Sequence, residues 1–180
     1  MTPGKPPLQN PQVTADIKIS RYTGIPFPDR RYLPGIRMTR PVKDRTGHIP
    51  QIPPPAVAFD AATWNLSQRY LYAVDLFNYR YWWEAHEVLE ELWLETGKRA
   101  DIGKFVQGLI QISAALLKSS QPHSGSRRLA AKGLAKLRLQ SGIFLGLDVH
   151  EFGRRVEAYI MKETPAPPAI ELRMPDRISA

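Results

Sequence analysis

The chain has 180 residues, of which 43% are hydrophobic, with no cysteine and a formal net charge of +8. This length suits one domain with an extension, and the lack of cysteine excludes disulfides, thiolate metal sites and a cysteine nucleophile. No apolar run reaches the roughly 18 residues of a membrane span and no secretory signal begins the chain, so we expect a cytoplasmic protein without a membrane partner.

The first 58 residues are expected to form an irregular, proline-rich arm. They show no helical periodicity, and proline disfavours a helix both at its own position and at the preceding one. Residues 17–38 nevertheless contain too many apolar side chains for a solvated linker. We therefore predict that the arm between residues 17 and 50 packs over a helical domain that spans residues 59–163.

The hydrophobic periodicity of the rest predicts an all-α bundle of about five helices. The expected spans are about 60–77, 82–96 and 102–118, a fourth helix opening near 124 or 126, and a fifth from 148 to about 163. Asp60 is a good N-cap for the first helix, which would place Leu66 on its inward face. Asp148, with Glu151 three residues later, is a capping-box-like start for the fifth. A proline-rich tail, residues 164–180, follows.

Charge is unevenly distributed along the chain. Residues 60–102 carry four basic and eight acidic groups, whereas residues 103–147 carry seven basic groups and no acidic one. Part of this charge is expected to serve electrostatic complementarity within the molecule and not an external ligand. Nucleic acid is not an expected partner, because the basic fourth helix has neither interleaved aromatic residues nor a known motif.

The stretch F-N-Y-R-Y-W-W-E-A-H-E-V-L-E-E-L-W, residues 77–93, concentrates groups that could bind a metal or move a proton. At about 100° per residue, His86 and Glu90 lie one helical turn apart, and Glu84 and Glu87 line a border of the apolar face. Three tryptophans fall among these polar side chains, which is typical of a helix enclosed by others. Some of the carboxylates should therefore be partly buried and need a partner.

The sequence from His86 to Glu90 approaches the zinc motif H-E-x-x-H, in which two ligands one turn apart share a metal and the intervening Glu is the base. In this interpretation His86 and Glu90 bind a divalent metal such as Zn²⁺ or Mn²⁺, Glu87 is the general base, and a third ligand comes from elsewhere. The alternative is a structural network of hydrogen bonds and ion pairs. In that network the carboxylates would meet Gln107, Gln111, Lys118 or an arginine of the arm.

The predicted third helix is apolar except for one narrow polar stripe. Its four side chains, Lys104, Gln107, Gln111 and Lys118, fall within about 60° of one another. Because buried amides need hydrogen-bond partners, we place this stripe against the Glu and His residues of the second helix. The resulting pocket would accept a small anionic ligand. Its lining would be Asn78, Glu84, His86, Glu90, Trp93, Gln107, Gln111 and Lys118.

Two motifs resemble those of a known family. The stretch at residues 77–93, followed by F-V-Q-G-L-I-Q at residues 105–111, is similar to the paired motifs of the bacterial domain-of-unknown-function family 309. The resemblance covers roughly residues 62–140 and implies a small all-helical domain and a predicted metal-dependent hydrolase. Some relatives also have an R-Y-x-P-G segment and a later G-H in an N-terminal extension, which resemble the segment beginning at Arg31-Tyr32 and the dipeptide ending at His48.

The chain departs from the family pattern at three positions. Arg80 occupies the position of the family's turn glycine, where positive φ would carry a modest steric cost. A histidine often follows the Q-G-L-I-Q helix, but this chain has Lys118 there. Arg40 stands where the extension often reads P-H-P. The last two positions therefore supply cations in place of imidazoles.

Three functional hypotheses follow. The first is a polar pocket between the second and third helices that holds an anion, a small ligand or a divalent metal, with hydrolase activity. The second is a non-enzymatic binding or scaffold module, in which the polar cluster locks the bundle and the arm or the basic helix meets a protein partner or a second copy of the chain. The third and weakest is a nucleic-acid-binding accessory protein, which predicts salt-sensitive binding. The P-loop, the dinucleotide fingerprint and the G-x-S-x-G elbow are all absent.

Overall fold

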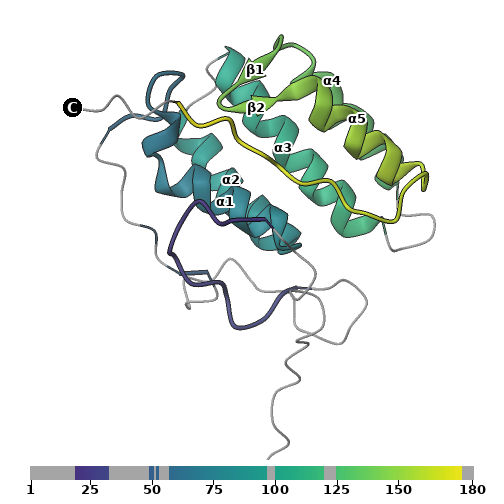
Figure 1. The fold of residues 1–180 in the computed structure, drawn as a ribbon, viewed down its shortest axis with the longest axis horizontal. Coiled ribbons are helices and arrows are strands. Elements are labelled where there is room, and N and C mark those ends of the chain that lie inside the picture. Colours follow the sequence, from purple (N-terminus) through teal and green to yellow (C-terminus); the bar gives the residue numbers. More distant parts are fainter. Residues whose placement is uncertain are drawn as a thin grey trace, which may run out of the picture.

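The computed structural model describes residues 19–32, 49–50, 52, 57–96, 100–119 and 125–175. These residues form five α-helices, as predicted, and a short antiparallel hairpin that was not predicted (Figure 1). The helices are α1 (Gln68–Asn78), α2 (Trp82–Thr96), α3 (Ala100–Lys118), α4 (Ser126–Leu137) and α5 (Val149–Ile160), and the strands are β1 (Ile143–Phe144) and β2 (Leu147–Asp148). None of the described helices is both long and apolar enough to cross a membrane.

The start of the first helix differs from the prediction. Ser67, and not Asp60, is the N-cap of α1, since its side chain accepts a hydrogen bond from the N–H of Tyr70. Asp60 instead caps a separate turn ahead of the 3-10 helix η2 (Trp64–Leu66). This turn interrupts the helical period, so Leu66, predicted to face inward, is 60% exposed. The predicted capping of α5 by Asp148 is confirmed.

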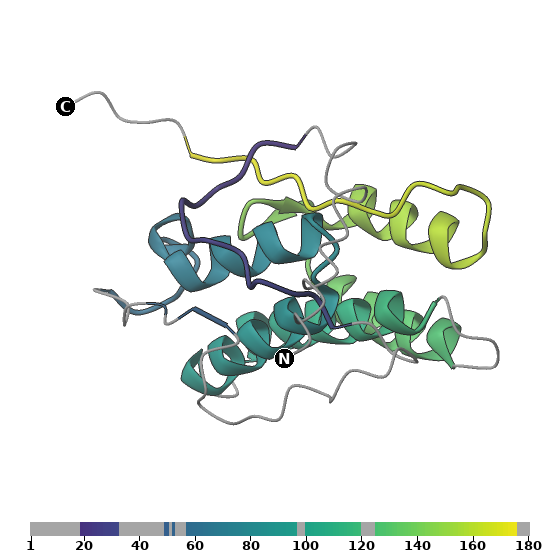
Figure 2. The ribbon, with the colours of Figure 1, turned by 90° about the horizontal axis from the view of Figure 1, so that it is seen from below.

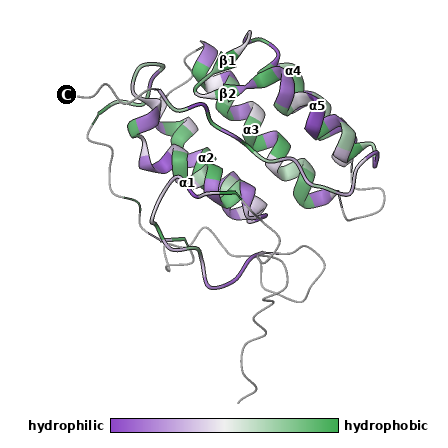
Figure 3. Ribbon diagram, in the orientation of Figure 1, coloured by the Kyte–Doolittle hydropathy of each residue, from purple (hydrophilic) through white to green (hydrophobic). Residues whose placement is uncertain are grey.

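The helices pack in chain order: α2 lies against α1 and α3, α3 against α4, and α4 against α5. Figure 2 shows α1 and α5 above α3 and α4, and Phe77 of α1 meets Phe152 of α5 with ring centroids 5.7 Å apart. In Figure 3 every helix carries both hydrophobic and hydrophilic residues. The completely buried aromatic side chains come from α1, α3 and α5. They include Tyr70, Tyr72, Phe77, Phe105 and Phe152.

Two glycines allow α3 and α4 to approach closely. A Cβ added to Gly108 would lie 3.0 Å from the carbonyl oxygen of Gly133 and 2.9 Å from Cδ2 of Leu137. A Cβ added to Gly133 would lie 2.8 Å from the carbonyl oxygen of Gly108. The Gly of the Q-G-L-I-Q motif therefore serves helix packing, because any side chain there would push the two backbones apart.

A buried carboxylate on α1 holds the arm against the bundle. Asp75 is 1% exposed, and it accepts hydrogen bonds from the backbone N–H groups of Tyr22 and Thr23, at 2.7 and 2.9 Å, and from the Thr23 hydroxyl at 2.8 Å. Nε of Arg21 lies 3.6 Å from the same carboxylate. Residues 19–32 of the arm are thus packed on the helices, as predicted; most of its remainder lies outside the described residues.

The segment expected as a tail is held against the bundle as far as Arg173, whose N–H donates to the carbonyl of Gly146 at 2.8 Å. The Asn78 side chain donates to the carbonyl of Ile170 at 2.9 Å and accepts from the Ile170 N–H at 2.7 Å. The Leu172 N–H donates to the Tyr22 hydroxyl at 2.7 Å, and both Ile170 and Leu172 are buried. This segment runs back across the molecule from the end of α5 (Figure 1). Tyr22 therefore links the arm to the C-terminal segment.

Candidate functional site

The turn that leads into α2 uses a left-handed residue. Arg80 has φ +66°. The N–H groups of Arg80 and Tyr81 donate to the carbonyls of Phe77 and Leu76, at 3.1 and 2.8 Å. These two bonds form a Schellman motif, a helix ending that glycine favours at its left-handed position. The chain therefore adopts positive φ at the position where the family motif has glycine.

Helix α2 has one buried face, and its carboxylates contact three different parts of the structure. Its inward residues Ala85, Val88, Leu89 and Leu92 are buried, which confirms the predicted apolar face. On the α1 side, Arg69 forms ion pairs with Glu91 and Glu95. The remaining carboxylates lie near the arm or around His86.

Glu84 is completely buried beneath the arm. Its Oε1 accepts a 2.8 Å hydrogen bond from the backbone N–H of Tyr32. The Tyr32 ring lies 5.1 Å from the ring of Trp83, between centroids. Burial lowers the pKa of the half-buried Arg31, and the negative charge of nearby Glu84 opposes that shift. The arginine and tyrosine that begin the R-Y-x-P-G segment thus cover the first turn of α2.

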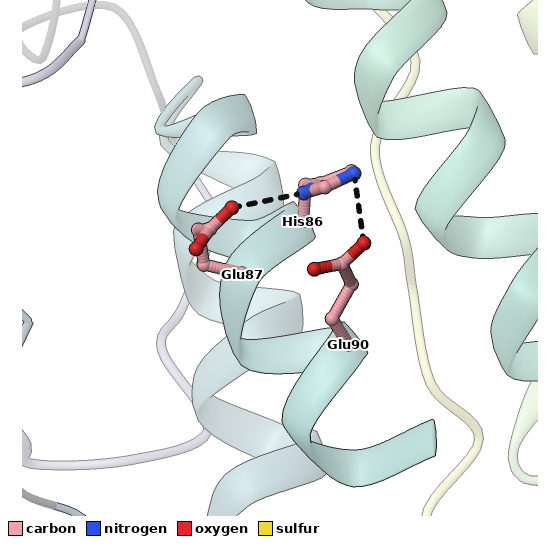
Figure 4. Close-up of side chains that lie close together, drawn as sticks. All are labelled: His86, Glu87 and Glu90. Carbon is pink, nitrogen blue, oxygen red and sulfur yellow. Dashed lines mark ion pairs between the residues drawn. The ribbon is translucent and has the colours of Figure 1, made fainter. Parts of the chain in front are cut away.

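His86 lies between two carboxylates (Figure 4). Its Nδ1 is 3.4 Å from Oε1 of Glu87, and its Nε2 is 3.7 Å from Oε1 of Glu90. The imidazole stacks on Trp83, with centroids 5.6 Å apart and an interplanar angle of 16°. The side chains of His86, Glu87 and Glu90 are 19%, 13% and 33% exposed, and Trp93 is half-buried. The cluster therefore lies at the surface but is shielded on one side by tryptophan.

The chemistry of this cluster fits a divalent cation. One donor atom each from His86, Glu87 and Glu90 lies within 4.8 Å of the other two, and no second such group of donors occurs in the described part of the chain. The Nδ1 atom of His86 is buried without a hydrogen bond, and both nitrogen–carboxylate separations exceed the roughly 3.2 Å limit of a good hydrogen bond. Two ligands of one tetrahedral zinc ion, each at about 2.1 Å, lie about 3.4 Å apart. The separation between Nε2 and the Glu90 carboxylate thus suits a shared cation better than a direct hydrogen bond.

The structure does not gather all the predicted pocket residues at this cluster. Oε1 of Gln111 accepts a 3.1 Å hydrogen bond from Nζ of Lys136 on α4, a partner that was not predicted from the sequence. Lys118 is exposed and Gln107 is half-buried, while the amide of Asn78 binds the C-terminal segment. The polar stripe of α3 therefore lies at the surface between α2 and α4, where Lys136 can reach it.

Two pockets near the hairpin involve none of the predicted site residues. They have volumes of about 250 and 260 Å³, and Arg173 lines both. In the first, Arg173 pairs with Asp148 at 3.1 Å, and Arg155 pairs with Glu151 and Glu171. Because each charged side chain of this pocket already has an ion-pair partner, the pocket offers no unpaired charge to a ligand.

The fold and the cluster on α2 define a small helical-bundle domain with a histidine–carboxylate face. Residues 70–129 match the family model described as "Domain of unknown function (DUF309)", so this region of the chain is similar to that family. The resemblance expected from the paired motifs is thereby confirmed. The matched residues include the His86 cluster and Gly108. No curated protein and no solved structure matches the chain.

Proposed function

We propose that the face of α2 formed by His86, Glu87 and Glu90 binds a divalent cation such as Zn²⁺ or Mn²⁺, and that the domain is a metal-dependent hydrolase. The proposal depends on one observation, the convergence of an imidazole and two carboxylates within 4.8 Å. Imidazole ligands suit zinc and carboxylate ligands suit manganese, so the mixed donor set is compatible with either ion.

The positions of the three side chains suggest their roles. Nε2 of His86 and the carboxylate of Glu90 would hold the cation, which when bound makes water more acidic and polarises a carbonyl or phosphoryl oxygen. Glu87, beside Nδ1 at 3.4 Å, would accept the Nδ1–H and fix the tautomer of the imidazole, as carboxylates beside ligating histidines do. Its second oxygen can accept a proton from water, the base role predicted from the sequence. Trp83 keeps the imidazole ring in place by stacking on it.

Metal analysis of the purified, untagged chain tests the cation site. We expect metal near one equivalent in the wild type, and a melting temperature that falls when a chelator is added and recovers with Zn²⁺ or Mn²⁺. His86→Ala should lose both the metal and the response to chelator. His150→Ala, which removes an exposed histidine of α5, should keep both. A metal-free wild type whose melting ignores chelator would exclude the site.

Substitution of Glu87 tests the hydrolase part of the proposal. Glu87→Gln keeps the shape of the side chain but removes its charge, so it should abolish metal-dependent turnover in a screen of ester and phosphoester substrates while the melting temperature changes little. Glu91→Gln, on the α1 side of the same helix, should keep turnover. Full activity in Glu87→Gln would contradict a role for this carboxylate in the reaction.

A non-enzymatic binding or scaffold module is the second candidate function. It is favoured by the structural use of other polar residues in the two motifs. Glu84 binds the arm, Asn78 binds the C-terminal segment and Gln111 binds α4. In such a module the His86 cluster would be part of the same network. His86→Ala and Glu87→Gln would then change the melting temperature with or without metal, and no substrate would be turned over.

A further inference from the structure

In the described part of the chain, many arginines that lie outside α3 and α4 form ion pairs with carboxylates. Arg69 of α1 lies against Glu91 and Glu95, Arg155 lies against Glu151, and Arg173 lies against Asp148. Even Arg138, just after α4, pairs with Glu157 of α5 at 2.5 Å. The expectation that charge would serve internal complementarity therefore holds for these residues.

The exposed side of α3 and α4 is different. Residues 103–147 contain no acidic residue. Lys104 and Lys118 of α3 and Arg128 and Lys132 of α4 are exposed. None of these four forms an ion pair with any residue that the structure describes. Four cations therefore face solvent without a counter-charge from the described chain.

The cations of α4 lie in one row. Arg128, Lys132 and Lys136 follow one another at i,i+4 steps, so they lie on the same side of the helix at intervals of about 6 Å. Like charges at this spacing repel each other. The inward residues Ala130, Gly133, Leu134 and Leu137 occupy the opposite side of α4. The row is thus unfavourable for the isolated chain and is turned outward.

The rows of α3 and α4 share one face. Nζ of Lys136 donates to Oε1 of Gln111 across the two helices, and Gln111 belongs to the same narrow stripe of α3 as Lys104 and Lys118. The close approach of the two backbones at Gly108 keeps the rows adjacent. We call this surface the α3–α4 basic face. It consists of Lys104, Lys118, Arg128, Lys132 and Lys136, with the amides of Gln107 and Gln111 between them.

We propose that the α3–α4 basic face binds the phosphate backbone of double-stranded nucleic acid without reading its sequence. Lysine, arginine and glutamine side chains are among the groups that contact phosphates in such complexes. The face complements the negative charge of a polyanion, because residues 103–147 contain no carboxylate that would repel it.

The other side chains of this face argue against other partners. The exposed large hydrophobic residues of the described chain, among them Leu66, Leu94 and Ile143, all lie outside α3 and α4. A protein interface takes much of its energy from buried apolar or aromatic anchors, a membrane surface needs apolar side chains that insert, and single strands need aromatic rings for stacking. The α3–α4 basic face offers none of these among its described residues, but a duplex backbone requires only cations and donors.

Binding of the full chain to a fluorescent duplex, measured by anisotropy at several salt concentrations, tests the proposal. The wild type should bind DNA or RNA duplexes of unrelated sequence, and log affinity should fall with log salt at about 0.9 for each phosphate contacted. Arg128→Gln combined with Lys132→Gln should lower affinity roughly 10- to 100-fold at about 0.1 M salt and reduce the salt slope by about 2. Both side chains are exposed and their charges repel each other, so the melting temperature should stay the same or rise slightly.

A matched control removes the same charge elsewhere. Arg154→Gln combined with Lys162→Gln takes two exposed cations from α5 and the turn after it, and it should leave the salt slope close to that of the wild type. Equal losses in the two double variants would overturn the proposal, because net charge alone would then explain binding. Absence of duplex binding would also overturn it, as would equally tight binding of poly-glutamate or of anionic vesicles, which would assign the face to an acidic protein or a membrane.

Discussion

The backbone N–H of Tyr32 donates a 2.8 Å hydrogen bond to Oε1 of Glu84, a residue 52 positions later in the chain. Glu84 is completely buried in the first turn of α2, two residues before His86. The Tyr32 ring packs on Trp83, which stacks on the His86 ring. The arm therefore forms one wall of the structure around the candidate metal site. Loss of the arm contact should change the packing of Trp83 on His86.

Replacement of Glu84 by alanine should loosen the arm and destabilise the fold. The substitution leaves the Tyr32 N–H without its acceptor in a partly buried position, which costs about 1–3 kcal/mol of the free energy of unfolding. Urea denaturation measures this loss, and trypsin should cleave sooner after Arg30 or Arg31. Glu91→Ala, which removes an exposed carboxylate from the same helix, should have a smaller effect. Equal effects of the two substitutions would show that the arm contact contributes little.

The features that could be predicted from the sequence were mainly those that depend on one helix alone, such as side-chain spacing and capping. His86 and Glu90 lie one turn apart in any helix, and the capping of α5 by Asp148 depends on a residue only three positions away. Partners across helices could not be obtained this way. The hydrogen bond between Gln111 of α3 and Lys136 of α4 was not predicted, because it depends on how these two helices pack.

Two further features were missed for physical reasons. Asp75 stands in the apolar run Y-A-V-D-L-F, where a lone carboxylate indicates a buried partner. That partner is the backbone of Tyr22 and Thr23. It could not be predicted, because these residues lie in an arm that has no helical or strand periodicity. The β1–β2 hairpin turns at Leu145 and Gly146, both with positive φ. Leucine is a poor residue for such a turn, which favours Asn-Gly, so the usual hairpin signal is lacking.

Glycine at position 80 should stabilise the protein. Arg80 has φ +66°, which a residue with a Cβ adopts only at an energetic cost. Arg80→Gly removes that cost but adds freedom to the unfolded chain, so we expect a net gain of about 0.5–1 kcal/mol, seen as a higher melting temperature. Arg80→Ala is the control, because it removes the same charge beside Arg31 but keeps the Cβ. A gain in the alanine variant as large as in the glycine variant would mean that charge, and not φ, limits stability.

An added methyl group at Gly108 should separate α3 from α4. The new Cβ would meet Cδ2 of Leu137 at 2.9 Å and the Gly133 carbonyl at 3.0 Å. Because the carbonyl belongs to a helix backbone that cannot move alone, Gly108→Ala should destabilise the protein by about 1–3 kcal/mol. Gly153→Ala in α5 is the matched control, since its Cβ would lie 3.5 Å from Leu134. That variant should be neutral or up to about 1 kcal/mol more stable through helix propensity. Stabilisation by both substitutions would contradict a tight contact at Gly108.

Alkaline pH should destabilise the fold through its buried tyrosines. Burial raises the pKa of Tyr70, whose hydroxyl donates to the Leu145 carbonyl at 3.0 Å, and burial also raises the pKa of Tyr72. Above about pH 10 these side chains lose their protons in the unfolded chain but keep them in the folded one. The unfolded state then binds fewer protons, so the free energy of unfolding falls as pH rises, by up to about 1.4 kcal/mol per pH unit for each such tyrosine.

Tyr70→Phe separates this effect from the loss of a hydrogen bond. At neutral pH the variant should be less stable by about 1 kcal/mol, because the Leu145 carbonyl loses its donor. Between about pH 10 and 11, however, its free energy of unfolding should fall less steeply than that of the wild type, since one fewer buried tyrosine is linked to unfolding. Between about pH 6 and 8, where free tyrosine does not titrate, the two proteins should show the same slope. Identical slopes above pH 10 as well would mean that Tyr70 ionises equally in the folded and unfolded states, which its complete burial argues against.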